Sequence, residues 1–168
     1  MILNLRGINL NPEAAPEDMV SLRMWIEGRT IVTARLRKVW AVEALRDSVA
    51  AGKPPQSVGR VLVELTQGLT NRIETVSLEL EDQTDEFEVL ALDRQFVAPE
   101  NLGRTRQAVI KMRRFINPQR EAVSALAALE DWILHEDDLA ALRENANRTR
   151  RIVEELDATR DRLSAVQD

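Results

Sequence analysis

The feature that most constrains the fold is a long amphipathic stretch, residues 58–98, that no proline interrupts. Its apolar residues recur every three or four positions, which is the spacing of one face of an α-helix. A straight helix of that length would extend roughly 60 Å at 1.5 Å per residue. Such length is typical of helical bundles and coiled coils. The apolar positions that predict this helix are Val58, Val61, Leu62, Leu65, Leu69, Ile73, Val76 and Leu80.

Two more helical segments follow. One begins near Arg104, and Pro118 is expected to kink or break it. The other begins near Asp137 or Asp138. Its apolar pattern still continues at Asp168 without a cap, glycine or proline, so we expect a truncated helix. Its heptad seam, typical of a coiled coil, comprises Leu139, Leu142, Ala146, Thr149, Val153, Leu156, Arg160 and Leu163. The residues expected on the solvent-facing side of this helix are Asn145, Asn147, Arg148 and Arg151.

The first third predicts β structure and one short helix. Residues 20–27 alternate apolar and polar side chains, the pattern of a half-buried strand, with further strands over 2–9 and 30–36 and a helix over 39–49. So few strands cannot bury both faces of a sheet. We therefore expect the sheet to be incomplete at its N-terminal edge, and Met1 to begin a truncated chain.

These elements define an α+β fold class: a small, partial β-sheet with a covering helix, followed by three long helices that form an antiparallel bundle and stalk. We divide the chain into an α+β part (1–56), a long helical hairpin (57–136) and the start of a stalk helix (137–168).

Charge is concentrated in the long helix. Residues 79–88 contain six acidic residues and no basic one, and a basic cluster follows over residues 104–114. One interpretation is that both are solvated helix faces. The other is a hairpin that turns near residues 99–103, which would set Glu86 opposite Arg114 and Asp93 near Gln107.

Composition excludes several function classes. The chain has no cysteine and a single histidine, which excludes disulfides, thiolate zinc sites and cysteine nucleophiles and disfavours a multi-histidine metal site. The net charge of −5 argues against nucleic-acid binding. Apolar runs are far shorter than the ~20 residues of a membrane span, so a soluble chain is expected. A hydrolase using Asp and Glu alone is disfavoured because nothing arranges those residues around a pocket, and we predict no enzyme.

Two clusters are candidate cation sites. Glu81, Asp85 and Glu88 share one helix face and offer oxygen ligands; the alternatives are a solvated face or a charge match between helices. His135 and Asp138 lie in a stretch with one imidazole and three carboxylates. The favoured alternative there is that Asp137 or Asp138 caps the last helix and His135 sits in the connection. The three tryptophans are expected to be core or interface anchors: Trp25, Trp40 and Trp132.

Several segments resemble one family in the same order along the chain. The residues 5–12 (LRGINLNP), 16–25 (PEDMVSLRMW) and 31–35 (IVTAR) are similar to the CorA superfamily, and within it to the ZntB-like zinc transporter branch. The stretches Ala41-Val42-Glu43, 114–121 (RFINPQRE) and 156–162 (LDATRDR) extend the resemblance to more than 150 residues.

The resemblance implies the cytoplasmic domain of a zinc or other divalent-cation transporter. In that family a funnel-shaped α+β domain carries long helices to the membrane, where two spans per subunit form the pore of a homopentamer. The resemblance thus implies contributions to pentamer assembly, ion attraction and gating, with Zn²⁺ as a possible ligand, no tightly bound cofactor, and attachment to the membrane through absent C-terminal spans. The full-length form would place this domain on the cytoplasmic side of the inner membrane. The alternative is a stand-alone coiled-coil scaffold.

Overall fold

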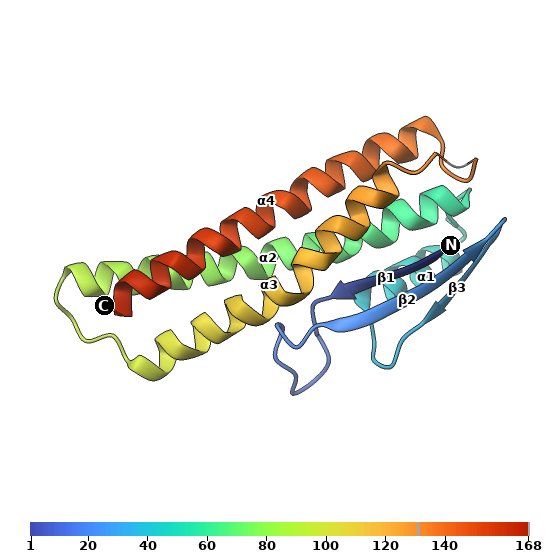
Figure 1. The fold of residues 1–168 in the computed structure, drawn as a ribbon. Helices are drawn as coiled ribbons and strands as arrows, with labels where there is room; N and C mark the ends of the chain where they lie inside the picture. Colours follow the sequence, from blue (N-terminus) through green and yellow to red (C-terminus); the bar gives the residue numbers. More distant parts are fainter. Residues whose placement is uncertain (131, 168) are drawn as a thin grey trace.

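The computed structural model, which describes residues 1–130 and 132–167, has the predicted α+β fold. A small sheet lies against one end of an elongated bundle of long helices (Figure 1). The strands are β1 (Ile2–Gly7), β2 (Val20–Glu27) and β3 (Thr30–Ala34). The helices are α1 (Trp40–Ala50), α2 (Val58–Leu92), α3 (Pro99–Ala127) and α4 (Glu136–Gln167).

The sheet is antiparallel in the order β1-β2-β3. The alternation predicted for β2 is confirmed, because Val20, Leu22, Met24 and Ile26 are buried and the residues between them are not. A two-residue turn joins β2 to β3, and its Gly28 has φ of 56°, a left-handed conformation that glycine adopts without strain. One face of the sheet therefore packs on the helices.

Helix α2 begins where the sequence predicts and ends earlier. The Ser57 hydroxyl accepts a hydrogen bond from the Arg60 backbone N–H at 3.0 Å, which caps the helix. At the other end Arg94 has φ of 54°, and Gln95 and Arg94 donate to the carbonyls of Leu90 and Ala91. This is a Schellman cap with arginine in the place usually held by glycine. The predicted continuation to residue 98 is wrong because no glycine marks the end.

Helix α3 begins at Pro99, not near Arg104. Proline is favoured in the first helical turn because its fixed φ is helical and its missing N–H would have no partner there. The predicted turn over 99–103 is therefore wrong, and the chain reverses over residues 93–98. Pro118 lies inside the helix and does not break it.

The three long helices alternate in direction, so α2 and α4 run parallel (Figure 1). The predicted match of Glu86 with Arg114 is wrong in register, since the Thr105 hydroxyl donates to Gln83 Oε1 at 3.0 Å. That contact sets residue 105 beside 83, whereas the predicted hairpin would place residue 117 there. The earlier start of α3 accounts for the shift.

Helix α4 buries most of its predicted seam, including Leu142, Thr149, Leu156 and Leu163. Asn145, expected on the wet side, is buried with 1% of its surface exposed, and neither its Oδ1 nor its Nδ2 has a hydrogen-bond partner within the described residues. The prediction for this residue is wrong because α4 packs against both α2 and α3, which buries a wider stripe than one seam.

The division into three parts stays a prediction. The core of the sheet continues into the bundle through residues of every helix, and a second core fills the distal part of the bundle. Over the described residues, no helix combines the length and the apolar character needed to cross a membrane.

The start of α4 packs tightly against α2 at Gly59. A Cβ placed on Gly59 would lie 2.3 Å from Asp138 Oδ2 and 2.6 Å from the Ile133 carbonyl oxygen. We expect Gly59→Ala to lower the free energy of unfolding by about 2 kcal/mol, because backbone has to move. Urea denaturation followed by circular dichroism measures the change.

Gly103→Ala is the matched control. Gly103 lies inside α3, and no atom lies within 4 Å of an added Cβ. Alanine there is expected to raise the free energy of unfolding by about 0.5–1 kcal/mol through its higher helix propensity. Equal effects of the two substitutions would contradict the close packing at Gly59.

Candidate functional site

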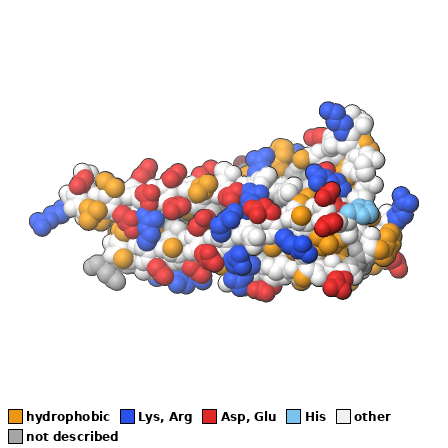
Figure 2. All heavy atoms as spheres, turned by 90° about the horizontal axis from the view of Figure 1, so that it is seen from above, with side chains coloured by type: hydrophobic (Ala, Val, Ile, Leu, Met, Phe, Trp, Pro, Cys, Tyr) orange, Lys and Arg blue, Asp and Glu red, His pale blue; other side chains and the backbone are white. Residues whose placement is uncertain are grey.

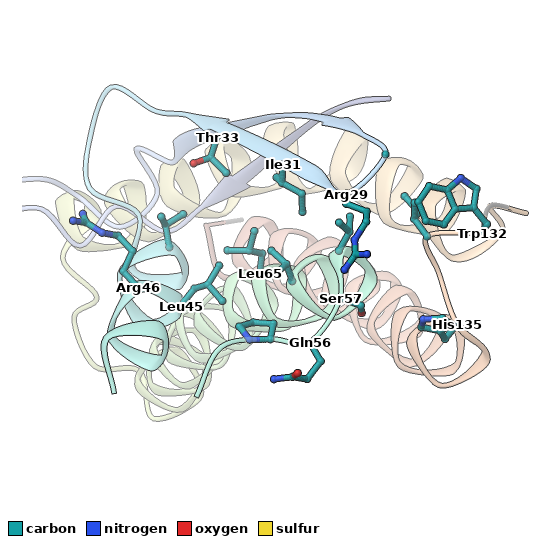
Figure 3. Close-up of a pocket in the computed structure, with 16 residues that line it drawn as sticks. Arg29, Ile31, Thr33, Leu45, Arg46, Gln56, Ser57, Leu65, Trp132 and His135 are labelled. Carbon is teal, nitrogen blue, oxygen red and sulfur yellow. The ribbon is translucent and has the colours of Figure 1, made fainter. Parts of the chain in front are cut away.

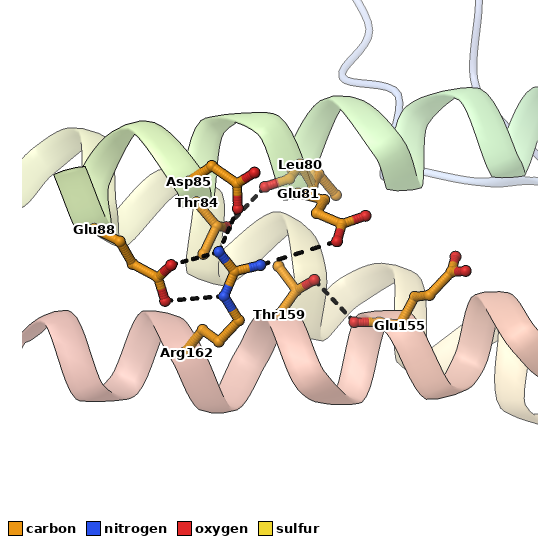
Figure 4. Close-up of polar contacts among 8 residues, drawn as sticks. All are labelled: Leu80, Glu81, Thr84, Asp85, Glu88, Glu155, Thr159 and Arg162. Carbon is orange, nitrogen blue, oxygen red and sulfur yellow. Dashed lines mark hydrogen bonds and ion pairs between the residues drawn. The ribbon is translucent and has the colours of Figure 1, made fainter.

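The acidic face of α2 meets one arginine of α4. Glu81, Asp85 and Glu88 are spaced four and three residues apart, which places them along one side of the helix. Arg162 projects from the parallel α4 into the middle of these three carboxylates (Figure 4). Sequence reasoning identified the three acids but missed Arg162 as their partner.

Arg162 contacts all three carboxylates. Its Nε donates to Glu88 Oε1 at 2.9 Å and its Nη2 donates to both Glu88 and Asp85. The Nη1 atom lies 3.9 Å from Glu81 Oε1, an ion pair without a hydrogen bond. The fork geometry with Glu88 is the arrangement in which arginine binds a carboxylate most strongly.

The floor below these charges is polar but internally satisfied. Thr84 and Thr159 are buried, and each hydroxyl donates to a carbonyl of its own helix, Leu80 O at 2.7 Å and Glu155 O at 2.8 Å (Figure 4). Neither hydroxyl proton is therefore available to the carboxylates. Within the described residues, Arg162 is the basic side chain that pairs with the three carboxylates.

The charges shift one another's proton affinities. The hydrogen bond from Arg162 lowers the pKa of the Glu88 carboxyl, although partial burial opposes the shift. Hydrogen bonds to Glu88 and Asp85 raise the pKa of Arg162 above its already high value. Both shifts favour the charged forms of Glu88 and Arg162 in the folded state.

Glu155 of α4 lies beside this cluster without joining it (Figure 4). Burial, followed by the nearby charges of Glu81 and Glu74, raises the pKa of its carboxyl, and Arg151 only partly offsets this. The ionised form of Glu155 therefore lowers the stability of the folded state.

Two more ion pairs fix α4 in place. Arg148 pairs with Glu74 of α2, and Arg113 of α3 pairs with Asp157. Figure 2 shows acidic and basic side chains interspersed along the elongated body. Within the acid-rich segment of α2, three of the six acids share Arg162 of α4, which agrees in part with a charge match between helices.

The second candidate cluster is a helix cap. Asp138 is buried, and its Oδ2 accepts a hydrogen bond from the His135 backbone N–H at 3.2 Å, as the third residue of a helix does in a capping box. The same carboxylate lies against Gly59 at the start of α2, where a negative charge is favoured. Asp138 therefore caps the helix as predicted, but from its third position, because α4 begins at Glu136 and not near Asp137 or Asp138. His135 itself is exposed.

His135 lies at the rim of a cavity of about 680 Å³ between β3, α1 and the start of α2 (Figure 3). Ile31, Leu45 and Leu65 form its apolar floor, and Trp132 stands at the rim near His135. Trp132 is 69% exposed, so a core position for it is wrong. Trp25 and Trp40 are 44% and 40% exposed, and they also lie outside the core.

The structure does not bring the two candidate clusters together. His135 and Asp138 lie at the start of α4, whereas Arg162 and its acids lie near its end (Figure 1). Among the described residues, no group of three or more metal-binding side chains is arranged to hold an ion. A cation site at Glu81, Asp85 and Glu88, or at His135 and Asp138, stays a prediction.

Comparison with known proteins identifies the class to which this fold belongs. The family model of the CorA-like Mg²⁺ transporter protein matches residues 1–168. The chain therefore belongs to the CorA-like family, which confirms the resemblance seen in the sequence.

Two relatives are matched over nearly the whole chain. The divalent cation transporter CmaX of Pseudomonas aeruginosa is 37% identical over 171 residues, covering 100% of this chain and 51% of that protein. The zinc transport protein ZntB of Yersinia enterocolitica is 30% identical over 167 residues, covering 99% and 51%. The chain spans about half the length of these relatives. Both are named as ion transporters, in agreement with the expectation that the chain is not an enzyme.

Two solved structures share the fold. The structure of full-length CmaX superimposes with a TM-score of 0.92 at 38% identity, covering 99% of this chain and 51% of that one. The crystal structure of the ZntB cytoplasmic domain from Vibrio parahaemolyticus has a TM-score of 0.86 at 27% identity, covering 99% and 66%. The small sheet and the long helices are thus the fold of that cytoplasmic domain.

Removing Arg162 tests its role in the cluster. We expect Arg162→Gln to lower the free energy of unfolding at pH 7 by about 1 kcal/mol, because three carboxylates then face one another without a cation. The loss should shrink with added salt and disappear at acidic pH. The pKa of Glu88 is lowered in the fold, so its contribution is present above the unfolded value and is lost as pH falls through the folded one.

Chemical denaturation at several pH values measures this effect. Arg160→Gln is the matched control, since Arg160 pairs with its neighbour Asp161 on the same helix. We expect that control to leave stability nearly unchanged, because an exposed ion pair between neighbours on one helix contributes little. Equal losses of unfolding free energy in the two variants would show that the ion pairs between α2 and α4 stabilise the fold no more than a pair within one helix.

Glu155→Gln should stabilise the fold. Because the pKa of Glu155 is raised, its charged form is disfavoured in the folded state at neutral pH. We expect a gain of about 0.5 kcal/mol at pH 7. The gain should vanish as pH falls through the folded pKa, where the wild-type carboxyl becomes protonated. Denaturation of both proteins at pH 7 and pH 4 measures it, and a loss of stability at pH 7 would contradict this account.

Proposed function

We propose that this chain is the cytoplasmic domain of a divalent-cation transporter. The observation that carries the proposal is the match to the ZntB cytoplasmic domain across 99% of the chain, with a TM-score of 0.86. It is supported by two relatives whose names state the transport of divalent cations or zinc. The domain lies on the cytoplasmic side of the inner membrane, and the pore belongs to the part of the protein beyond this chain.

The work of the domain is assembly, ion attraction and gating. Helix α4 packs along both α2 and α3, and ion pairs at Arg148 and Arg162 hold it in one register on α2. Because Arg148 and Arg162 are 14 residues apart, these two ion pairs make α4 move together with α2. In the proposed homopentamer, α4 transmits a change in the domain to the pore, and the acids of α2 raise the local concentration of cations, with zinc as the first candidate.

Transport by the full-length protein tests this proposal. Reconstituted into vesicles that contain a metal-sensitive dye, the protein is expected to take up Zn²⁺, with Mg²⁺, Co²⁺ and Ni²⁺ as comparison ions. Empty vesicles, and vesicles with heat-denatured protein, give the background. Uptake of none of these ions by folded protein would overturn the proposal.

A charge-matched pair of triple variants tests ion attraction. Replacing Glu81, Asp85 and Glu88 by glutamine removes the carboxylates around Arg162. Replacing Glu79, Asp82 and Glu86 removes three exposed acids of the same helix. If the clustered acids gather cations, the first triple variant should raise the half-saturating Zn²⁺ concentration severalfold more than the second. Equal effects would show that only the net charge of α2 matters.

A further inference from the structure

A second cavity, of about 770 Å³, lies at one end of the sheet, and two of its lining residues, Arg6 and Asp18, contact side chains of α3. The ends of β1 and β2, the connection between them and the segment that follows β3 form its walls. Its volume is within the range of small-molecule sites. It is separate from the acidic cluster on α2 and from the cavity beside His135.

Four arginines line this cavity: Arg6, Arg23, Arg35 and Arg37. The strand register pairs Arg6 with Ser21 and Asn4 with Arg23, so Arg6 and Arg23 are diagonal neighbours on the outer face of the sheet. Diagonal neighbours in an antiparallel pair lie about 7–8 Å apart. Long side chains on neighbouring positions of that spacing can reach one phosphate or two linked phosphates.

Most of these guanidinium groups keep unused donors. Arg6 stacks over the Phe115 ring with 4.7 Å from Cζ to the centroid, which leaves its in-plane N–H groups available. Arg35 pairs with Glu43, but its Nη1 is buried with no hydrogen-bond partner in the described part of the chain. Within the described residues, Arg23 and Arg37 have no ion pair, and both are exposed.

The acids at the cavity do not cancel this charge. Asp18 is held by Lys111, with 2.8 Å from Oδ1 to Nζ, and the contact raises the pKa of Lys111. Glu43 neutralises Arg35. Glu13 is the remaining acid of the lining, against three guanidinium groups. The cavity therefore carries an excess of positive charge although the whole chain is acidic.

One wall of the cavity is fixed without a ligand. Asn9 is buried, and its Nδ2 donates to the Asp18 carbonyl at 2.9 Å while its Oδ1 accepts from the Asn11 side chain at 2.8 Å. The Asn9 backbone N–H donates to the Pro16 carbonyl at 3.1 Å. The connection is thus held in one conformation, so binding there would cost little ordering of the chain.

We propose that this cavity binds a small organic phosphate. Arginine is the side chain best suited to phosphate oxygens, because its planar fork donates two parallel hydrogen bonds. Pro12, Ala14 and Met19 give the cavity an apolar side, which suits the organic part of a phosphate ester. The ligand is an anion, so this site is distinct from any site for the transported cation and goes beyond the proposed function.

Isothermal titration calorimetry of the 168-residue chain tests the proposal, with ATP and inorganic pyrophosphate as probes in the presence of EDTA. We expect saturable binding of one ATP per chain, tighter than pyrophosphate and weakened by salt. Vesicles of phosphatidylglycerol form a separate arm, which distinguishes a lipid phosphate from a soluble one. Binding of neither soluble probe, or binding of vesicles alone, would overturn the proposal.

A pair of double variants locates the site. Arg23→Gln with Arg37→Gln should weaken ATP binding at least about tenfold, because two phosphate contacts are lost. Arg29→Gln with Arg46→Gln removes the same charge from exposed arginines at the other cavity and should change binding less than about twofold. All four side chains are exposed, so circular dichroism is expected to show intact folds. Equal weakening by both pairs would show non-specific attraction and overturn the assignment.

Discussion

The packing of α4 along α2 is the interaction on which the rest of the structure depends. The two helices are distant in sequence and run parallel, so no short connection sets their register. Leu142, Leu156 and Leu163 of α4 are fully buried in the cores that α4 forms with its neighbours, and such burial of apolar surface stabilises the fold. The ion pairs of Arg148 and Arg162 add little energy each but favour one register, because a shift of one helical turn would separate Arg148 from Glu74 and move Arg162 away from the centre of its three acids.

Much of the fold could be predicted from the local spacing of apolar residues, because burial of one face determines both that spacing and the element that forms. The alternation in β2 and the seam of α2 reflect burial on one face, and the cap at Ser57 needs only a hydroxyl before a helix. The errors fall where the deciding interaction is unusual or distant. Arg94 ends α2 in a conformation that sequence analysis assigns to glycine, and this one residue displaced the predicted hairpin register.

Only the acids of the candidate site could be predicted, because local spacing determines their shared face but not their partner on another helix. The spacing of Glu81, Asp85 and Glu88 places them on one face whatever the fold. Their partner depends on how a helix more than seventy residues later is aligned, which no local pattern records. Arg162 is one of several arginines in α4, and nothing in its neighbourhood distinguishes it. Asn145 was misplaced similarly, because an amide is normally solvated and this one is buried only through the packing of α4 against both α2 and α3.

The same carboxylates cannot hold Arg162 and a divalent cation at full strength. A cation that binds Glu81, Asp85 and Glu88 competes with a guanidinium that is tethered to the fold and is therefore always at high effective concentration. Cation binding is then coupled to the loosening of α4 from α2. By linkage, the factor by which the bound cation favours the loosened state equals the factor by which loosening raises the affinity for the cation. If a cation binds there as predicted, an acidic cluster that already holds an arginine would connect ion concentration to the position of α4, which an open cluster of carboxylates would not do.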